Sequence, residues 1–274
     1  MNNTFRDFIS SFGYTPPEFI PTGKIVRFGK KKHLWAMLFI DGDCGVFGDW
    51  KGSGKQFIWR SDHKTLSKQE QLSRAKELAS IRQKVAKERE QEYQQVALKA
   101  QEIYAYAKPF NCRHPYLVKK KINLTGGIKQ HHSNLLIPVE GEDGNIQTIQ
   151  YISDKGSKIF LKGGKVKGGF HRIGEIEQSE TPRIYIAEGF ATGHSIHEDS
   201  GGNFVVVALS ASNLEQVALI FRRQYPKAQI IICGDNDPTG LNYAKKASQL
   251  VRGSAVFPPA EFNDWNDYLT GENK

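Results

Sequence analysis

Short apolar runs alternate with amphipathic stretches over the last third of the chain. The apolar runs are rich in β-branched residues and predict strands at RIYIAEG (183–189), NFVVVALS (203–210), QIIICGDND (229–237) and GSAVFPP (253–259). The stretches between them predict amphipathic helices at 190–201, 213–226 and 238–251. Strands and helices that alternate in this way are typical of a parallel sheet with helices on both faces. We therefore expect an α/β domain over residues 182–274.

Residues 109–181 follow a different pattern. NLLIPV (134–139) and IQTIQYI (146–152) flank the turn residues EDGN and predict a β-hairpin. KIFLKGG (158–164) and GGFHRIG (168–174) predict two further short strands with glycine-rich turns. These runs predict a mixed α+β subdomain directly before the α/β domain.

Residues 63–108 contain no proline or glycine, and apolar residues recur there at three- and four-residue spacing. This predicts a long amphipathic helix, about 60 Å if unbroken, that links two domains or packs along the second one. Before it, residues 1–62 alternate in short runs separated by glycine and aspartate turns. The runs at 23–28, 34–50 and 55–60 predict a small, mostly antiparallel β module.

Composition narrows the class of protein. Of the 274 residues, 39% are hydrophobic and 24% are charged, which fits a soluble globular protein without a membrane partner. No apolar stretch indicates a membrane span or a secretory signal. The three cysteines form no CxxC pair, which argues against a zinc ribbon and a disulfide framework and fits a reducing cytoplasm. The formal net charge of +9 favours a polyanionic partner, of which nucleic acid is the commonest.

Positive charge is most concentrated between Ser153 and Arg172, where Asp154 is the single acid. The basic residues of this stretch are Lys155, Lys158, Lys162, Lys165, Lys167 and Arg172. Because the neighbouring glycines let a phosphate backbone approach closely, the stretch favours a nucleic-acid or triphosphate surface. The alternative is a solvated basic hairpin with no ligand.

Basic residues also interleave with aromatic residues near the N-terminus. Lys31 and Lys32 stand close to Trp35 in the sequence, and Trp59 follows Lys55. Cations that meet phosphates, beside rings on which bases stack, suit single-stranded nucleic acid. In the alternative interpretation the rings form the core of the small sheet, and the lysines keep its edges soluble.

Two predicted strands of the α/β domain end in acids. The first closes with Glu188, and the third closes with Asp235 and Asp237 on either side of Asn236. Because ligands of open α/β sheets bind outside the carboxyl ends of the strands, we expect the three carboxylates to meet in one cleft. Mg²⁺ prefers such oxygen ligands, and a cation would remove the repulsion among the acids. Taken alone, Asp-Asn-Asp-Pro also fits plain turn and helix-cap chemistry.

Together, IAEGF on the first strand and GDND on the third resemble the Toprim motif, over residues 182–270. Toprim domains occur in bacterial-type primases, topoisomerases, OLD-family nucleases and ribonucleases that mature ribosomal RNA. The resemblance implies that Glu188 is a general acid/base or a metal ligand, and that Asp235 and Asp237 hold Mg²⁺ or Mn²⁺, with no zinc expected. FNDWNDYL resembles the late acidic motif of primase Toprim domains, so Asp264 and Asp267 are candidates to complete the metal site or to cap the last helix.

The upstream sequence separates the Toprim families. There is no room for the tyrosine domain of a topoisomerase and no Walker A loop of an OLD nuclease, and the ribonucleases begin with Toprim. From about residue 112 the chain instead resembles the subdomain that precedes Toprim in primases of plasmids and phages, where Lys158 would reach template or nucleotide phosphates. In two departures, this chain lacks the zinc ribbon of cellular primases, and Thr192 stands where those primases carry an acid.

The resemblance implies a primase that makes short primers on a single-stranded DNA template by metal-dependent nucleotidyl transfer. Its partners would be nucleoside triphosphates and a replicative helicase or another replication protein of a mobile element. The alternatives are a metal-dependent nuclease with the same acids and a non-catalytic single-stranded DNA-binding protein. Clustered carboxylates facing DNA would cost a binding module affinity, which argues against the last alternative. His194 and His197 follow Glu188 on one predicted helix, and we expect core or surface roles for them.

Overall fold

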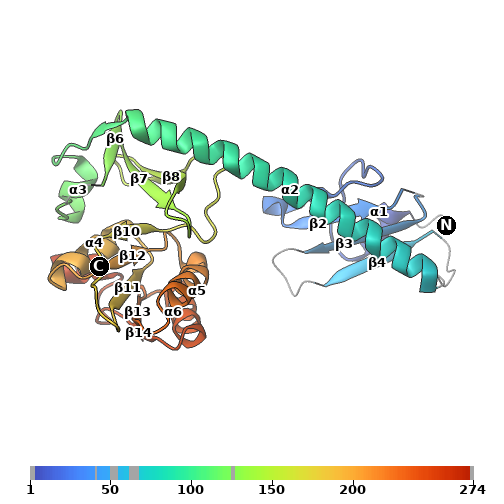
Figure 1. Cartoon of the computed structure of the whole chain (residues 1–274). Helices are drawn as coiled ribbons and strands as arrows, with labels where there is room; N and C mark the ends of the chain where they lie inside the picture. Colours follow the sequence, from blue (N-terminus) through green and yellow to red (C-terminus); the bar gives the residue numbers. More distant parts are fainter. Residues whose placement is uncertain (1–3, 41, 50–54, 62–67, 125–126, 272–274) are drawn as a thin grey trace. The chain divides into compact units, whose positions relative to one another are not determined.

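The computed structural model describes residues 4–40, 42–49, 55–61, 68–124 and 127–271 (Figure 1). The chain forms two compact units, Met1–Glu90 and Gln91–Lys274, and each is described by itself. Trp50 and Lys51, part of the basic and aromatic pattern near the N-terminus, lie outside the described residues.

The first unit is a four-stranded antiparallel sheet with one short helix, as the alternation of residues predicts. The strands pair in the order β1-β2-β3-β4. The elements are α1 (Phe5–Ser11), β1 (Val26–Phe28), the 3₁₀ turn η1 (Lys30–Lys32), β2 (Leu34–Leu38), β3 (Cys44–Asp49) and β4 (Gln56–Arg60). Leu34 and Ala36 of β2 pack in the cluster with α1, whereas Trp35 and Met37 pack in the opposite cluster, which Ile81 joins. The sheet is therefore buried on both faces.

The two tryptophans singled out in the sequence belong to this core. Trp35 is 3% exposed and Trp59 is 8% exposed, so neither ring offers a free face on which a base could stack. Their burial favours the interpretation in which the aromatic residues build the small sheet. Lys31 and Lys32 are exposed in η1 with φ angles of 63° and 52°, and their contact with nucleic acid stays a prediction.

Helix α2 (Lys68–Tyr106) runs without a break over 39 residues, about 60 Å at about 1.5 Å per residue. Its apolar side chains are not buried along the whole length, because Leu72 and Val85 are 58% and 38% exposed. Burial in the second unit begins near the end of the helix, where Ala100 is fully buried in a cluster with Leu136 and Ile149. The helix therefore buries its apolar side chains at only some positions along its length.

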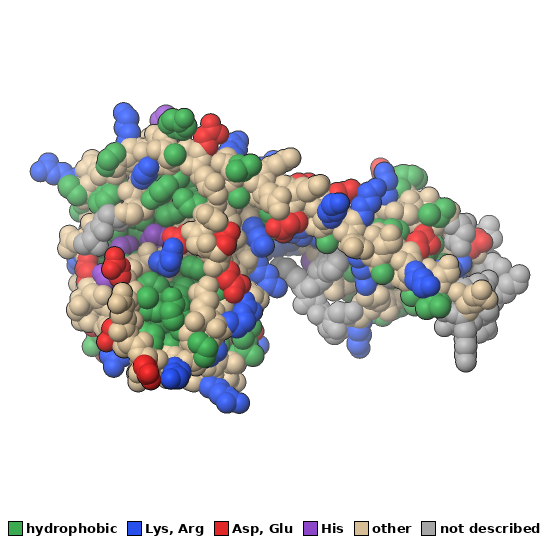
Figure 2. Space-filling view, viewed as in Figure 1, with side chains coloured by type: hydrophobic (Ala, Val, Ile, Leu, Met, Phe, Trp, Pro, Cys, Tyr) green, Lys and Arg blue, Asp and Glu red, His purple; other side chains and the backbone are tan. Residues whose placement is uncertain are grey.

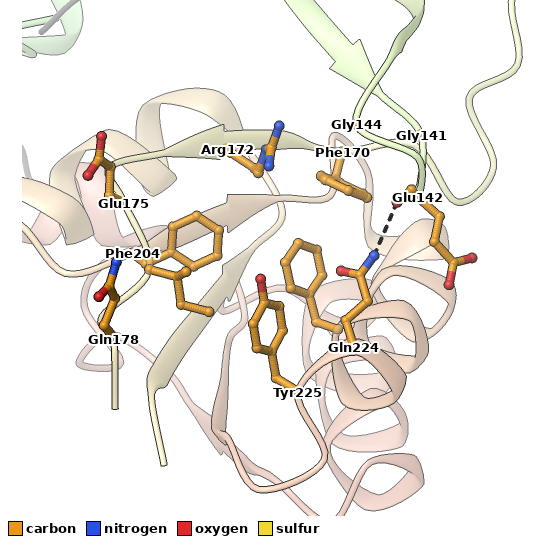
Figure 3. Close-up of a pocket in the computed structure, with 13 residues that line it drawn as sticks. Gly141, Glu142, Gly144, Phe170, Arg172, Glu175, Gln178, Phe204, Gln224 and Tyr225 are labelled. Atoms are coloured by element: carbon orange, nitrogen blue, oxygen red, sulfur yellow. Dashed lines mark hydrogen bonds between the residues drawn. The ribbon is translucent and has the colours of Figure 1, made fainter. Parts of the chain in front are cut away.

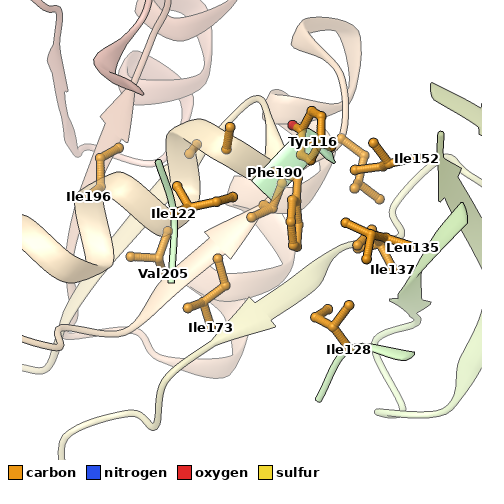
Figure 4. Close-up of a cluster of buried hydrophobic side chains, with 14 of the residues drawn as sticks. Tyr116, Ile122, Ile128, Leu135, Ile137, Ile152, Ile173, Phe190, Ile196 and Val205 are labelled. Carbon is orange, nitrogen blue, oxygen red and sulfur yellow. The ribbon is translucent and has the colours of Figure 1, made fainter. Parts of the chain in front are cut away.

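The second unit begins with an antiparallel sheet in the order β5-β6-β7-β8-β9. Its elements are β5 (Lys108–Pro109), α3 (Pro115–Lys120), β6 (Lys129–His131), β7 (Asn134–Glu140), β8 (Ile146–Ile152) and β9 (Lys158–Phe160). The expected hairpin is present as β7 and β8, which pair from Leu135 with Ile152 to Glu140 with Ile146. One face of this sheet packs on α2 and the other contributes to the large cluster of Figure 4.

The C-terminal sheet has the order β10-β12-β11-β13-β14, and its last four strands run parallel. The strands are β10 (His171–Ile173), β11 (Arg183–Ala187), β12 (Val205–Val207), β13 (Gln229–Cys233) and β14 (Ser254–Val256). Strand β10, which precedes Pro182, pairs antiparallel with β12 instead of extending the upstream sheet. The two short strands expected between residues 158 and 174 therefore belong to different sheets.

Helices cover both faces of the C-terminal sheet, as the sequence predicts (Figure 1). They are α4 (Phe190–Asp199), the 3₁₀ turn η2 (Ala211–Asn213), α5 (Leu214–Gln224), α6 (Pro238–Leu250) and α7 (Trp265–Thr270). Ile184 and Ile186 of β11 pack in the cluster with α5 and α6, whereas Ala187 packs with α4 and the upstream subdomain. This alternation follows from successive side chains pointing to opposite faces of a strand.

On the face of the second unit seen in Figure 2, apolar side chains gather over the strands of the C-terminal sheet. None of the helices in the described ranges combines the length and apolar character needed to cross a membrane.

Candidate metal centre

The acids predicted from the sequence lie at the carboxyl edge of the C-terminal sheet. Strands β11 and β13 are parallel neighbours, with Ala187 opposite Cys233, so Glu188 and Asp235 leave the sheet side by side. The chain passes from β11 to β12 on one side and then to β13 on the other. This reversal of strand order is where open α/β sheets bind ligands.

The carboxylates of this edge act on one another. Burial, together with the negative charges of Glu188, Asp264 and Asp237, raises the pKa of Asp235 to about 8. Burial and the charge of Asp237 also raise the pKa of Glu188, although the backbone of Ala211 donates a hydrogen bond to it. The Oδ1 atom of Asp235 is buried and has no hydrogen-bond partner among the residues that the structure describes. The four acids thus share one electrostatic site.

Two of these acids also cap helices. Asp237 precedes Pro238 and accepts a hydrogen bond from Gly240 N at 2.7 Å, so it is the N-cap of α6. Asp264 accepts from Asp267 N at 2.8 Å and is the N-cap of α7. The turn chemistry considered as an alternative is therefore present at Asp237 and Asp264. Each cap uses one carboxylate oxygen, Oδ1.

Asn236, between the two aspartates, holds the loop that carries Asp264. Its backbone N–H donates to Asn263 O at 2.8 Å, and its side-chain amide donates to Pro258 O at 2.7 Å and to Phe262 O at 3.1 Å. These bonds tie residues 258–263 to the end of β13 and so fix the start of α7. No role for Asn236 was predicted from the sequence.

Lys120, at the end of α3, was also missed. Its Nζ lies 3.1 Å from Asp267 Oδ1 and 4.0 Å from Asp264 Oδ2. Between these acids in sequence, the fully buried Asn266 donates to Lys120 O and to Ser195 Oγ, both at 2.8 Å. Asp267 therefore has a cationic partner, and α3 of the upstream subdomain is bound to α7.

Of the basic stretch, Lys158 on β9 is placed at the acids. A Cβ atom added at Gly189 would lie 4.0 Å from Lys158 Nζ. Lys158 as a residue is exposed, although protein atoms surround its ammonium group. Burial and the charge of Lys120 lower its pKa, against the opposing charges of Asp264, Asp235 and Glu188.

The other basic residues of the stretch have different surroundings. Lys165 lies over the Tyr93 ring, 6.0 Å from its centroid, and Arg172 forms an ion pair with Glu140. The remaining three, all exposed, are Lys155, Lys162 and Lys167.

A family model described as a Toprim domain matches residues 183–274. Residues 183–274 are a Toprim domain. The chain is also 31% and 28% identical to two Escherichia coli proteins named DNA primase TraC, over 224 and 222 residues. These matches cover 76% and 75% of this chain but only 15% and 20% of the relatives, so the chain spans less than a quarter of their length.

Solved primase structures are similar over part of the chain. The primase fragment of the bacteriophage T7 primase-helicase protein covers 53% of this chain and 62% of its own, with 17% identity and a TM-score of 0.41. The catalytic core of DnaG covers 58% of this chain and 55% of its own, with 16% identity and a TM-score of 0.38.

Toprim domains typically bind a divalent metal. Across the described ranges, no three His, Cys, Asp or Glu side chains are arranged, as they stand, to hold a metal ion. The oxygen ligands present nevertheless suit a divalent metal ion. The buried Oδ1 atom of Asp235 has no hydrogen-bond partner among the described residues, and the neighbouring carboxylates repel the charged form of Asp235. Glu188, Asp235 and Asp237, with Asp264 beside them, are the residues that would hold the ion.

Gly240 allows α6 to approach Asp235. A Cβ atom at this position would lie 2.6 Å from the backbone oxygen of Asp235. We expect Gly240→Ala to shift Asp235, to lower the free energy of unfolding by about 1–3 kcal/mol and to weaken stabilisation by Mn²⁺. Urea unfolding with and without Mn²⁺ measures both effects, with the exposed neighbour Thr239→Ala as the control. Equal behaviour of the two variants would contradict the prediction.

A cavity of about 540 Å³ lies at the opposite, amino edge of the Toprim sheet. Phe170, Phe204 and Tyr225 line it, and Gln224 donates a hydrogen bond to Glu142 O across its rim at 3.1 Å (Figure 3). Phe204 and Tyr225 precede β12 and β13, whereas the acids follow β11 and β13. The cavity is therefore separate from the candidate metal centre.

Proposed function

We propose that this protein synthesises short primers on single-stranded DNA by metal-dependent nucleotidyl transfer. The observation that carries the proposal is the placement of Lys158, from the basic strand β9, against the acids of the Toprim domain. A cation that faces phosphate and carboxylates that face metal are the two halves of a phosphoryl-transfer site. The relation to the DNA primases named TraC supports this choice of reaction.

The acidic and the basic residues have different proposed roles. Mg²⁺ or Mn²⁺, held by Asp235, Asp237 and Glu188, would lower the pKa of the attacking 3′-hydroxyl and offset negative charge on the leaving pyrophosphate. Glu188, whose pKa burial already raises, is suited to accept the proton of that hydroxyl. Lys158 would bind a phosphate of the incoming nucleoside triphosphate or of the template.

The proposed partners follow from the same chemistry. They are single-stranded DNA, nucleoside triphosphates and, in the cytoplasm of a cell that carries a mobile element, a replicative helicase or another replication protein. The exposed Lys155, Lys162 and Lys167 would contribute to binding the DNA backbone.

A direct assay tests the proposal. Single-stranded circular DNA is incubated with labelled ribo- or deoxyribonucleoside triphosphates and Mg²⁺ or Mn²⁺, and the products are separated on a denaturing gel. Short labelled oligomers are expected. Cleaved DNA without new oligomers would indicate a nuclease that uses the same acids, and bound but unchanged DNA would indicate a binding protein.

Lys158→Met should reduce primer synthesis about 10- to 100-fold, because it removes a charge-assisted contact to phosphate. Lys227→Met removes an exposed lysine at the amino edge of the Toprim sheet and should change the rate less than about threefold. The initial rates of both variants are compared with the wild type at saturating and at limiting triphosphate. If the two methionine variants lose activity to the same extent, Lys158 has no specific role in binding phosphate at the site.

A further inference from the structure

Tyr116 is the second residue of α3 and lies in the cluster between the upstream subdomain and the Toprim domain (Figure 4). Its side chain is 4% exposed, and Gly156 of the β8–β9 turn lies against its ring. The hydroxyl group is buried and has no hydrogen-bond partner in the part of the chain that the structure describes. Burying a hydroxyl without a partner costs free energy, so an unpaired one calls for a ligand or a water.

Tyr116 lies close enough to Asp264 to interact with its charge. Residues four apart lie on the same face of a helix, so Tyr116 and Lys120 project from the same side of α3. Lys120 Nζ lies 4.0 Å from Asp264 Oδ2, and the charge of Asp264 adds to burial in raising the pKa of Tyr116. The residue after Asp264 supplies a second such donor, because the buried indole N–H of Trp265 also lacks a partner among the described residues.

Three hydrogen-bond donors lie on this side of the site, beside the carboxylates of Asp264 and Asp267. Lys120 and Lys158 carry ammonium groups close enough for one to lower the pKa of the other. Tyr116 precedes Lys120 by one turn of α3. A metal ion would be repelled by two ammonium groups, whereas an anion with several oxygens can accept from all three donors. The carboxylates of Glu188, Asp235 and Asp237 suit the metal.

We propose that Tyr116 binds a phosphate group at this site, with its hydroxyl donating a hydrogen bond to a phosphate oxygen next to the metal held by the acids. The proposal rests on the proposed function, because it takes the acids as the metal ligands. The phosphate belongs either to a nucleoside triphosphate or to the backbone of single-stranded DNA.

Tyr116→Phe tests the proposal, because it removes the hydroxyl and keeps the ring. Tyr104→Phe is the matched control: the Tyr104 hydroxyl, in the same unit, donates to Gly127 O. Thermal unfolding is measured for both variants without ligand, with Mn²⁺ alone and with Mn²⁺ plus a non-hydrolysable nucleoside triphosphate. Fluorescence anisotropy measures their binding to a labelled single-stranded oligonucleotide.

We expect Tyr116→Phe to keep or raise the metal-free melting temperature and to keep the wild-type shift with Mn²⁺ alone. Its affinity for one phosphate ligand should fall about 10-fold, the loss of one hydrogen bond to a charged group. A loss confined to the triphosphate identifies that source of phosphate, and a loss confined to the oligonucleotide identifies DNA. Tyr104→Phe should instead lower the melting temperature and keep both affinities.

Two results would overturn the proposal, and they differ. If Tyr116→Phe binds both phosphate ligands as the wild type does, the hydroxyl has no part in phosphate binding while the metal site stands. If the wild type gains no stability from Mn²⁺ or Mg²⁺, the acids do not form a metal site, and the proposed function fails together with this inference.

Discussion

Asp235→Asn is expected to abolish primer synthesis, by about 10³-fold or more, and at the same time to stabilise the metal-free protein. The activity is lost because the amide cannot carry the negative charge that a divalent cation needs. The stability rises because the wild-type carboxyl is buried beside Glu188 and Asp264, has an unpartnered oxygen among the described residues, and titrates with a pKa of about 8. We expect a gain of about 2 kcal/mol near neutral pH.

The pH dependence of this gain has a definite sign. In the unfolded chain the carboxyl loses its proton near the ordinary aspartate pKa of 3.8, whereas the folded protein keeps it until about pH 8. Between these values the folded state binds more protons, so the wild type loses stability as the pH rises. The advantage of Asp235→Asn should therefore be small at pH 4 and largest at pH 8.

Urea unfolding at several pH values measures the difference between Asp235→Asn and the wild type. Glu177→Gln, which removes one charge from an exposed loop at the amino edge, is the control and should give a nearly constant difference. Adding Mn²⁺ should stabilise the wild type and not Asp235→Asn. A variant that is less stable than the wild type without metal would make Asp235 a structural residue.

Acid is expected to destabilise the second unit through two buried histidines. His171 on β10 and His194 on α4 are 5% and 4% exposed, and their ring centroids lie 5.7 and 4.6 Å from that of Phe190. Burial lowers the pKa of His171 to about 4 and that of His194 to about 3, from 6.5. Both rings are therefore neutral at pH 7.

In this case the unfolded chain binds more protons, because its histidines charge below pH 6.5 while the folded ones stay neutral. The stability that these groups contribute is therefore present above pH 6.5 and is lost as the pH falls toward 4. For His171 alone the loss is about 3 kcal/mol, and His194 adds to it in the same direction.

Raised carboxyl pKa values oppose this slope, so the test is a comparison of variants. Unfolding of His171→Gln and of the wild type is measured from pH 7.5 to 4.5 at constant ionic strength. The contributions of Asp235, Glu188 and Glu140 cancel in the difference, which should shrink or change sign as the pH falls. His131→Gln, an exposed histidine, should show no such trend. A pH-independent difference for His171→Gln would show that the ring titrates normally.

The strands and helices of the Toprim domain could be predicted from the sequence because their periodicity is local. Strands β11, β12 and β13 are rich in β-branched residues, and the helices between them have buried apolar side chains. Strand β10 could not be assigned to its sheet in this way, because its pairing with β12 joins His171 to Val207. A three-residue strand carries no signal that tells which of two sheets it will join.

In the candidate site, too, some residues could be predicted from local sequence, and others are placed by contacts between distant parts of the chain. Glu188, Asp235 and Asp237 could be located because acids at strand ends converge in a parallel sheet. Lys120 and Tyr116 could not, because their place at the acids depends on α3 meeting α7; Asn266 and Lys120, which join these helices, are 146 residues apart in the sequence. Trp35 and Trp59 were ambiguous for another reason, since a ring that stacks on bases and a ring in a core give the same pattern.

The pairing of β10 with β12 has a consequence for where a Toprim domain can be cut from one protein and fused to another. Val205, Val206 and Val207 of β12 would form an open edge if β10 were absent, and a flat row of valines with free N–H and C=O groups pairs readily with other chains. Asn213 adds a further tie, since it accepts from Gly168 N and donates to Gly169 O, both at 2.8 Å. A fragment that began at Pro182 would contain the acids but lack β10, and its exposed β12 edge would be prone to aggregation. A Toprim fragment that keeps this edge covered therefore has to start upstream of Gly168.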